Sequence, residues 1–330
     1  LLLIVPFDKL ELYASLHLFV SALMLLWYKI YAEHKFNYCT SSLKYDKIYL
    51  KSMVSFSGWN LFGSIADIGY KQGTNIILNL FYGVALNAAM GIATTVRSTV
   101  FSFINNIHVA ANPQIVKSYA VNELSYYNNL LCKISKYSYF LMLFLAIPII
   151  INIQFILELW LGDVPAYSAS LIVLGLIFCL IDCLHGPLWT SMQATGTIKK
   201  YQLITSLVLL LNLPLSYWAL RLGYSPNSIM VVQIIVSAAT LIVRLLFSCN
   251  YAQVNLLEYV KQVIIPVITV SIIAVPVPMF IGMHYDASWN KLIVTGIVSV
   301  FSVIISVFFA GMSKAEKDAA IQVIRKRIKQ

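Results

Sequence analysis

The chain has 330 residues, of which 60% are hydrophobic and only 11% charged, and its mean hydropathy is +0.80. A soluble domain carries roughly 25% charged residues because it must solvate its surface, so this composition excludes a soluble enzyme, a disordered chain and a disulfide-stapled secreted domain. The net charge of +10 comes from basic residues that lie between hydrophobic segments rather than in one stripe, which fits a membrane better than a nucleic acid.

Leu1 is not a methionine, and Leu1–Phe7 is an apolar run that no basic residues precede, unlike a signal peptide. We therefore expect the chain to be the C-terminal part of a longer protein. Nine apolar segments follow, each near the 20 or so residues that cross a bilayer as a helix. They are Leu10–Ala32, Val54–Tyr82, Leu86–Ala111, Tyr137–Leu161, Ser168–Ala194, Tyr201–Leu222, Ile229–Phe247, Val260–Met283 and Leu292–Met312. These runs do not alternate polar and apolar residues, so they predict an all-α polytopic membrane protein rather than a β-barrel.

Basic residues collect in every second link between these segments and in the tail. They are Lys29, Lys35, Lys44, Lys47, Lys51, Lys117, Lys133, Lys136, Lys199, Lys200, Arg244, Lys261, Lys314, Lys317, Arg325, Lys326, Arg327 and Lys329. The opposite links hold few charges, so the positive-inside rule predicts that the basic links and the C-terminus face the cytoplasm. Ser313–Gln330 is typical of a short basic amphipathic helix lying on anionic headgroups.

Prolines also fall inside the apolar segments, where each removes a backbone hydrogen bond and can kink its helix. They are Pro148, Pro187, Pro214, Pro266, Pro276 and Pro278. Kinks permit bending in a transporter, but they are common in any membrane helix, so both interpretations stay open.

The second and third predicted helices differ from the others because polar residues recur along one face of each. On the second these are Asn60, Ser64, Asp67, Lys71 and Asn75; on the third they are Asn87, Thr94, Ser98, Asn105 and Asn112, flanked by Arg97 and His108. Polar groups at membrane depth are costly unless they face protein or water, so the two faces could together line a hydrated cavity. The alternative is structural: Asp67 and Lys71 are four residues apart and can pair, and Asn or Ser stripes can tie helices together.

Arg97 favours the functional interpretation. No acidic residue lies three or four positions from it, and an intramembrane guanidinium that stays charged needs an anion or a path to water. A phosphate would suit it, because the planar guanidinium grips two oxygens. Asp182 and His185, three residues apart on the fifth predicted helix, are candidates for proton or ion coupling, with a satisfied interior hydrogen bond as the alternative.

Several catalytic motifs are missing from the sequence. It contains no GxxxxGK[ST] loop, no HExxH or CxxC metal spacing and no GxSxG elbow, so we expect no cofactor, no metal and no enzymatic activity. Five scattered cysteines fit a reducing compartment without a disulfide framework: Cys39, Cys132, Cys179, Cys183 and Cys249.

Six short stretches together resemble a known family. They are Ser57–Gly63 (SGWNLFG), Gln72–Asn79 (QGTNIILN), Asn87–Ala93 (NAAMGIA), Asn112–Ala120 (NPQIVKSYA), Gln193–Gly196 (QATG) and Asn212–Tyr217 (NLPLSY). The sequence resembles the Wzx-type polysaccharide flippases of the multidrug/oligosaccharidyl-lipid/polysaccharide exporter superfamily, in the version common in Bacteroidetes-type bacteria. The resemblance runs over essentially the whole chain and is densest from Ser57 to Ala120.

The resemblance implies a fold of 12–14 helices in two lobes around a central cavity, of which this chain holds the C-terminal portion. Residues 1–32 would be the last helix of the N-terminal lobe, 33–51 a basic interlobe linker on the cytoplasmic side, 52–250 the C-terminal six-helix lobe, 251–312 two additional transmembrane helices and 313–330 a basic cytoplasmic tail. Such proteins carry undecaprenyl-pyrophosphate-linked oligosaccharide from the inner to the outer leaflet of the bacterial cytoplasmic membrane by alternating access, with H⁺ or Na⁺ as the coupling ion. The implied partners are this lipid-linked oligosaccharide, membrane lipids and the polysaccharide polymerase machinery.

One departure from the family concerns the cationic residue. Relatives typically carry an arginine where this chain has Met90, and Arg97 stands seven residues on, at nearly the same angle and roughly 10 Å further along the helix. We hypothesise that Arg97, with Lys71, supplies the charge that attracts the pyrophosphate, while Asn, Ser and Thr groups hydrogen-bond the sugars.

Two other functions stay open. A drug/cation antiporter of the same superfamily would favour an acidic, aromatic-lined cavity. A multipass glycosyl- or phosphotransferase would need acidic or metal-binding residues at a membrane face, where the outer links offer only Glu158, Asp163 and Asp286.

Overall fold

The structure, a computed structural model, describes residues 9–36 and 46–328. The expectations for Leu1–Phe7, Cys39, Lys44 and Lys329 lie outside these residues. The chain divides into two compact units, Leu1–Val54 and Ser55–Gln330, and the first holds helix α1 (Lys9–Lys35). The finer domain boundaries expected from the sequence stay predictions.

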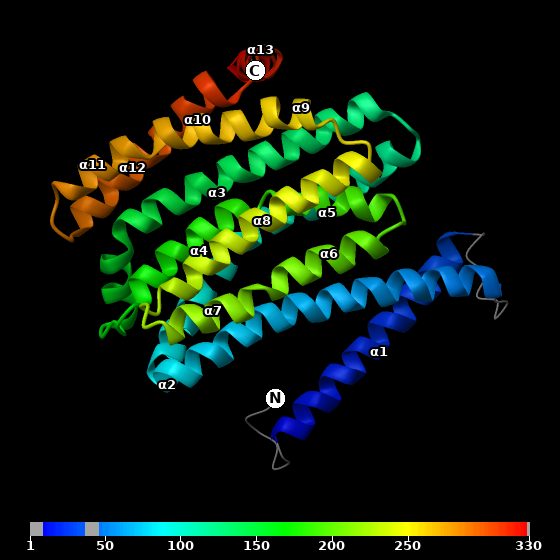
Figure 1. Cartoon of the computed structure of the whole chain (residues 1–330). Helices are drawn as coiled ribbons and strands as arrows, with labels where there is room; N and C mark the ends of the chain where they lie inside the picture. Colours follow the sequence, from blue (N-terminus) through cyan, green and yellow to red (C-terminus); the bar gives the residue numbers. More distant parts are fainter. Residues whose placement is uncertain (1–8, 37–45, 329–330) are drawn as a thin grey trace. The chain divides into compact units, whose positions relative to one another are not determined.

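Helix α2 (Lys47–Ala120) contains a sharp break at Gly83, whose backbone has φ +73° and ψ −167°. Side chains rarely tolerate this conformation, and glycine adopts it without steric cost. The chain turns back there, and the second half of α2 runs behind α4 and α8 in Figure 1. The break lies between the second and third predicted helices, so α2 is two helices joined by a glycine turn.

The remaining elements are all helical. They are α3 (Leu124–Leu161), α4 (Ser168–Asp182), α5 (His185–Ala194), α6 (Lys199–Leu210), α7 (Asn212–Arg221), α8 (Ser228–Tyr251), α9 (Leu256–Tyr259), the π-helix η1 (Val260–Ile264), α10 (Ile265–Ala274), α11 (Pro276–Met283), α12 (Trp289–Ser306), the π-helix η2 (Val307–Gly311) and α13 (Lys314–Ile328). Helix α3 begins at Leu124 instead of the predicted Tyr137, so Lys133 and Lys136 lie within a helix and not in a link. Residues 124–136, the first turns of α3, are too polar to be recognised in the sequence as part of an apolar segment.

Proline explains where several of these helices are interrupted. Helices α4 and α5 separate at Cys183 and Leu184, ahead of Pro187, and α6 and α7 separate at Leu211, ahead of Pro214. A proline lacks the N–H that would bond the carbonyl four residues earlier and its ring clashes with that carbonyl, so the helix breaks there. Pro148, by contrast, lies inside the unbroken helix α3.

Seven helical segments are long and apolar enough to cross a membrane, among the residues that the structure describes. They are Leu12–Lys35, Leu124–Leu161, Ser168–Ala194, Lys199–Arg221, Ser228–Tyr251, Leu256–Met283 and Trp289–Gly311. The protein is therefore an all-α, multi-pass membrane protein in its described part. The two predicted spans that do not reach this apolarity are the two halves of α2, which carry the polar stripes.

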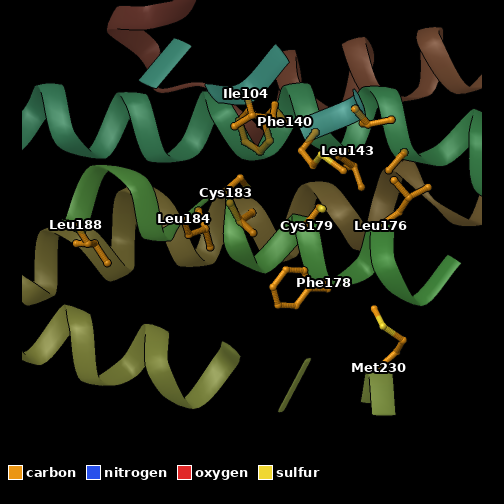
Figure 2. Packing of buried hydrophobic residues seen from close by; sticks show 14 of the residues in the cluster. Ile104, Phe140, Leu143, Leu176, Phe178, Cys179, Cys183, Leu184, Leu188 and Met230 are labelled. Carbon is orange, nitrogen blue, oxygen red and sulfur yellow. The ribbon is translucent and has the colours of Figure 1, made fainter. Parts of the chain in front are cut away.

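Within the second unit, α3 is packed between two groups of helices. It contacts α4 and α12, α4 contacts α8, and α8 contacts α5, α6 and α7 (Figure 1). Apolar side chains from the second half of α2, from α3 and from α4 fill the space between these helices, as Figure 2 shows for Ile104, Phe140, Leu143, Leu176 and Cys179. The polar stripe on the first half of α2 lies beside α5, α6 and α8.

One glycine permits a close approach between helices. A Cβ at Gly186 of α5 would overlap the imidazole of His108 on α2, whose Nε2 lies 3.0 Å from Ser138 Oγ on α3. Because His108 is buried and held by this hydrogen bond, only glycine lets α5 pack at this distance.

Candidate functional site

Two polar cavities lie side by side between α2, α5, α6 and α8. The larger, of about 280 Å³, is lined by Asn60, Gly63, Ser64, Asp67, Ile68, Trp189, Gln202, Thr205, Ser206, Leu209 and Arg244. The smaller, of about 110 Å³, is lined by Asp67, Tyr70, Lys71, Phe178, Asp182, His185, Leu209, Ser237, Thr240 and Arg244. Since Asp67, Leu209 and Arg244 line both, we treat the two cavities as one region, the α2–α8 polar site.

Asp67 and Lys71 form an ion pair along α2, with Lys71 Nζ 2.7 Å from Asp67 Oδ2. Their side chains are 44% and 51% exposed, respectively. The pairing predicted from their spacing of four residues is confirmed. Lys71 is therefore already neutralised in this conformation, and it would offer its charge to a ligand only by releasing Asp67.

The first half of α2 is tied to α5 and α7 by amides rather than by charges. Gln193 Nε2 donates to Asn60 Oδ1 at 2.7 Å, and Asn212 Nδ2 donates to Thr74 Oγ1 at 3.0 Å. Among the described residues, the one hydrogen bond of the Asn75 side chain is local: it donates to Gln72 Oε1 at 3.4 Å. Asn60 therefore ties two helices together, which was the structural alternative to lining a cavity.

The structure brings Asp182 and His185 to the same cavity but not into contact. Helix α4 ends at Asp182 and α5 begins at His185, so the two do not share one continuous helix face. His185 Nε2 lies 3.1 Å from Ser237 Oγ, and its Nδ1 is buried without a partner. Throughout residues 9–36 and 46–328, no hydrogen bond or ion pair engages the carboxylate of Asp182, although Lys71, Arg244 and Arg97 act on it electrostatically. A carboxylate facing a polar cavity beside cations that do not clamp it can exchange a proton or a cation.

Arg244, which the sequence pattern places near a link, was not expected at the site but lines both cavities. Helix α8 extends to Tyr251, so Arg244 lies more than one turn inside it. Its Nη1 donates to Tyr201 Oη at 2.7 Å, its guanidinium lies 5.6 Å from the centre of that ring, and its Nε is buried without a partner. The signal that could have found it is the spacing of Gln233, Ser237, Thr240 and Arg244, which puts four polar residues on one face of α8.

Arg97, on the second half of α2, lines neither cavity. Its Nη1 makes a long hydrogen bond of 3.5 Å to Gln233 Oε1, and its guanidinium lies 5.3 Å from the centre of the Phe178 ring. No carboxylate lies within 4 Å of its side chain in the described part of the chain. Arg97 is half-buried, so a guanidinium that makes no ion pair with a described residue lies among helices of a membrane protein.

In the stripe on this second half of α2, some side chains are hydrogen-bonded to a neighbouring helix and others are exposed. Asn112 Oδ1 accepts from Thr190 Oγ1 at 2.8 Å, so this end of the stripe, like His108, is bound to a neighbouring helix. Asn87 is half-buried, and its Oδ1 has no hydrogen-bond partner among the described residues. Between them, Thr94, Ser98 and Asn105 are exposed. Of the two cavities described above, neither is lined by residues from the second half of α2, so a cavity shared by the two polar faces stays a prediction.

The residues that the structure describes contain no group of three or more His, Cys, Asp or Glu side chains that could hold a metal ion. No protein-family model, no curated protein and no solved structure matches the chain.

Proposed function

We propose that the protein moves undecaprenyl-pyrophosphate-linked oligosaccharide from the inner to the outer leaflet of a bacterial cytoplasmic membrane by alternating access. The observation that carries this proposal is Arg97, a half-buried guanidinium among the helices with no carboxylate within 4 Å among the described residues. A pyrophosphate is a doubly charged group that cannot cross hydrocarbon unaided, and a guanidinium binds its oxygens in pairs.

The open face beside Arg97 supports the same proposal. Thr94, Ser98 and Asn105 are exposed on one stripe, and their hydroxyl and amide groups can both donate and accept hydrogen bonds. Such groups suit a polar sugar without requiring one sugar identity. In the proposed transporter this face lines the passage, and the lipid tail stays between helices.

The α2–α8 polar site would supply the coupling. Asp182 binds a proton or Na⁺ in one state of the transporter and releases it in the other, while Arg244 and Lys71 favour the empty carboxylate. On this proposal the protein is not an enzyme, its C-terminus is cytoplasmic, and the lipid-linked oligosaccharide and the polysaccharide polymerase machinery are its partners.

The test uses cells in which the complete gene has been deleted. A membrane-impermeant glycan-labelling reagent on intact cells reports which leaflet holds the lipid-linked glycan. Wild type restores outer-leaflet glycan, and Arg97→Ala lowers its formation by roughly ten- to a hundredfold, because a hydrogen bond to a charged group is worth about 1.5–3 kcal/mol. Arg221→Ala, at the exposed end of α7, is the matched control and keeps full export.

A further variant tests the position of the charge. Met90→Arg in the Arg97→Ala background restores export if a cation at either depth attracts the pyrophosphate. Export that Arg97→Ala leaves at the wild-type rate would overturn the proposal.

A drug/cation antiporter is the second candidate, and Asp182 is the observation that favours it. A carboxylate without an ion-pair partner suits an organic cation as well as a proton. Dye accumulation in the deletion strain separates the two functions: loss of dye efflux, with normal surface glycan and Asp182→Asn inactive, would support the antiporter.

A further inference from the structure

A third polar cavity, of about 690 Å³, shares no lining residue with the α2–α8 polar site. It opens between the first turns of α3, the α9–η1 segment and the η2–α13 junction, three segments that come from distant parts of the chain (Figure 1). Its charged lining consists of Lys133, Lys136, Glu258, Lys261 and Glu316.

Two of these five charges neutralise each other. Lys136 Nζ lies 2.8 Å from Glu316 Oε2, with the two side chains 6% and 11% exposed. Glu316 Oε2 also accepts the backbone N–H of Ser313 at 2.7 Å. This buried pair joins α13 to α3 and forms one wall of the cavity.

The other three charges leave an excess of positive charge. Gln262 Nε2 donates to Glu258 Oε1 at 2.8 Å, so that carboxylate is held by a neutral amide. No hydrogen bond or ion pair engages the ammonium groups of Lys133 and Lys261 in the part of the chain that the structure describes. Two cations from different helices therefore face one cavity with a single unneutralised carboxylate.

The depth of the cavity follows from the length of α3. Lys136 lies twenty-five residues before Leu161 at the far end of α3, which is about 37 Å along a helix. A hydrocarbon core is only about 30 Å thick, so the cavity falls at the level of lipid headgroups when α3 spans the membrane. Its apolar rim, which includes Pro266, Ala310 and Met312, suits the upper part of an acyl chain.

We infer that this cavity binds an anionic membrane phospholipid, with Lys133 and Lys261 holding its phosphate and α13 covering it. Basic pockets between membrane helices are the sites that bind anionic lipid headgroups. The volume lies within the usual range for small-ligand sites. The inference does not depend on what the protein transports.

The experiment measures lipid binding to the purified full chain by native mass spectrometry in mild detergent, with phosphatidylglycerol and phosphatidylcholine as probes. Wild type should bind phosphatidylglycerol at least tenfold more tightly than phosphatidylcholine. Each lysine near a headgroup contributes a factor of about five, so Lys133→Ala/Lys261→Ala should reduce this preference by roughly tenfold or more. The matched control is Lys199→Ala/Lys200→Ala, which removes the same charge at the start of α6 and keeps the preference.

A variant that binds more tightly shows that the loss in the double lysine variant does not come from misfolding. Glu258→Gln removes the carboxylate that repels the phosphate, so its preference for phosphatidylglycerol should rise by a few-fold. Equal binding of the two lipids by wild type would overturn the inference, as would an equal loss in the control. Displacement of phosphatidylglycerol by millimolar inorganic phosphate would instead assign the cavity to a free anion and would also overturn it.

Discussion

Two ion pairs of nearly equal length lie in very different surroundings in this protein. Asp67 and Lys71 are 2.7 Å apart within α2, and Lys136 and Glu316 are 2.8 Å apart between α3 and α13. The first pair is about half exposed, whereas the side chains of the second are 6% and 11% exposed. Since water and side-chain entropy weaken an exposed pair, the distance alone does not tell which pair supports the structure.

The difference also separates a local contact from a tertiary one. The first pair joins residues four apart and can form in any helix with this sequence, so it leaves α2 free to move. The second joins residues 180 apart and fixes the position of α13 on α3. We therefore expect the buried pair to contribute stability and the exposed pair to contribute mainly local charge balance.

The largest effect should come from breaking the buried pair. Glu316→Leu leaves the ammonium group of Lys136 buried without an acceptor, at a cost of roughly 3–5 kcal/mol. Undocking of α13 relieves this cost, so trypsin should cleave near Lys314 and Lys317 at least tenfold faster than in wild type. The double variant Lys136→Met/Glu316→Leu should restore protection, because it removes both charges. Unchanged cleavage in the single variant would show that the buried pair contributes no more to stability than the exposed pair does.

Acidification should act on the same pair. Burial alone would raise the pKa of Glu316, but the hydrogen bonds from Lys136 and from the Ser313 backbone outweigh it and hold the pKa below its usual range. The folded-state pKa is therefore lower than the unfolded one, so the stabilisation is present at neutral pH and is lost as the pH falls through the folded-state pKa. Trypsin protection of α13, measured by brief pulses after incubation at each pH, should fall on acidification in wild type. In Glu316→Gln this pH dependence should be absent, and a persisting slope would assign it to another group.

A smaller effect is expected from the Gln193–Asn60 contact, which holds α2 against α5 near the Asp67–Lys71 ion pair. Gln193→Leu removes the donor to Asn60 and leaves a half-buried amide with no partner on α5, which costs about 1–3 kcal/mol. Thermal unfolding in detergent should show a lowered midpoint. Gln72→Leu, at an exposed position in the same half of α2, is the control and should leave the midpoint near that of wild type.

The smallest effect should come from the exposed pair itself. Lys71→Met should change the free energy of unfolding by less than about 1 kcal/mol, because exposed pairs contribute little. A loss as large as that of Glu316→Leu, measured by thermal unfolding in the same detergent, would show that Lys71 has a partner other than Asp67.

The sequence predicted those features that depend on near neighbours. Apolar length predicted nine spans, of which seven are long and apolar enough to cross a membrane among the described residues. The predicted boundary between the second and third spans holds the break at Gly83, and of the prolines expected to disturb their helices, Pro187 and Pro214 follow helix interruptions. The Asp67–Lys71 pair belongs to the same class. Each follows from hydrophobic length or from backbone chemistry within about four residues, which a linear pattern displays directly.

Tertiary structure alone decided how the polar residues are used. Within one stripe of α2 it tied Asn112 to α5 and left Ser98 exposed, and it turned Arg244 of α8 into the same site as Asp182 of α4. It also buried Lys136, a residue that looks like an ordinary loop lysine in the sequence, against a glutamate near the other end of the chain. Helical periodicity sets which residues share a face, but the partner that covers this face comes from helix packing. For a polar group in a membrane protein, that partner decides whether the group is satisfied or free to bind a ligand.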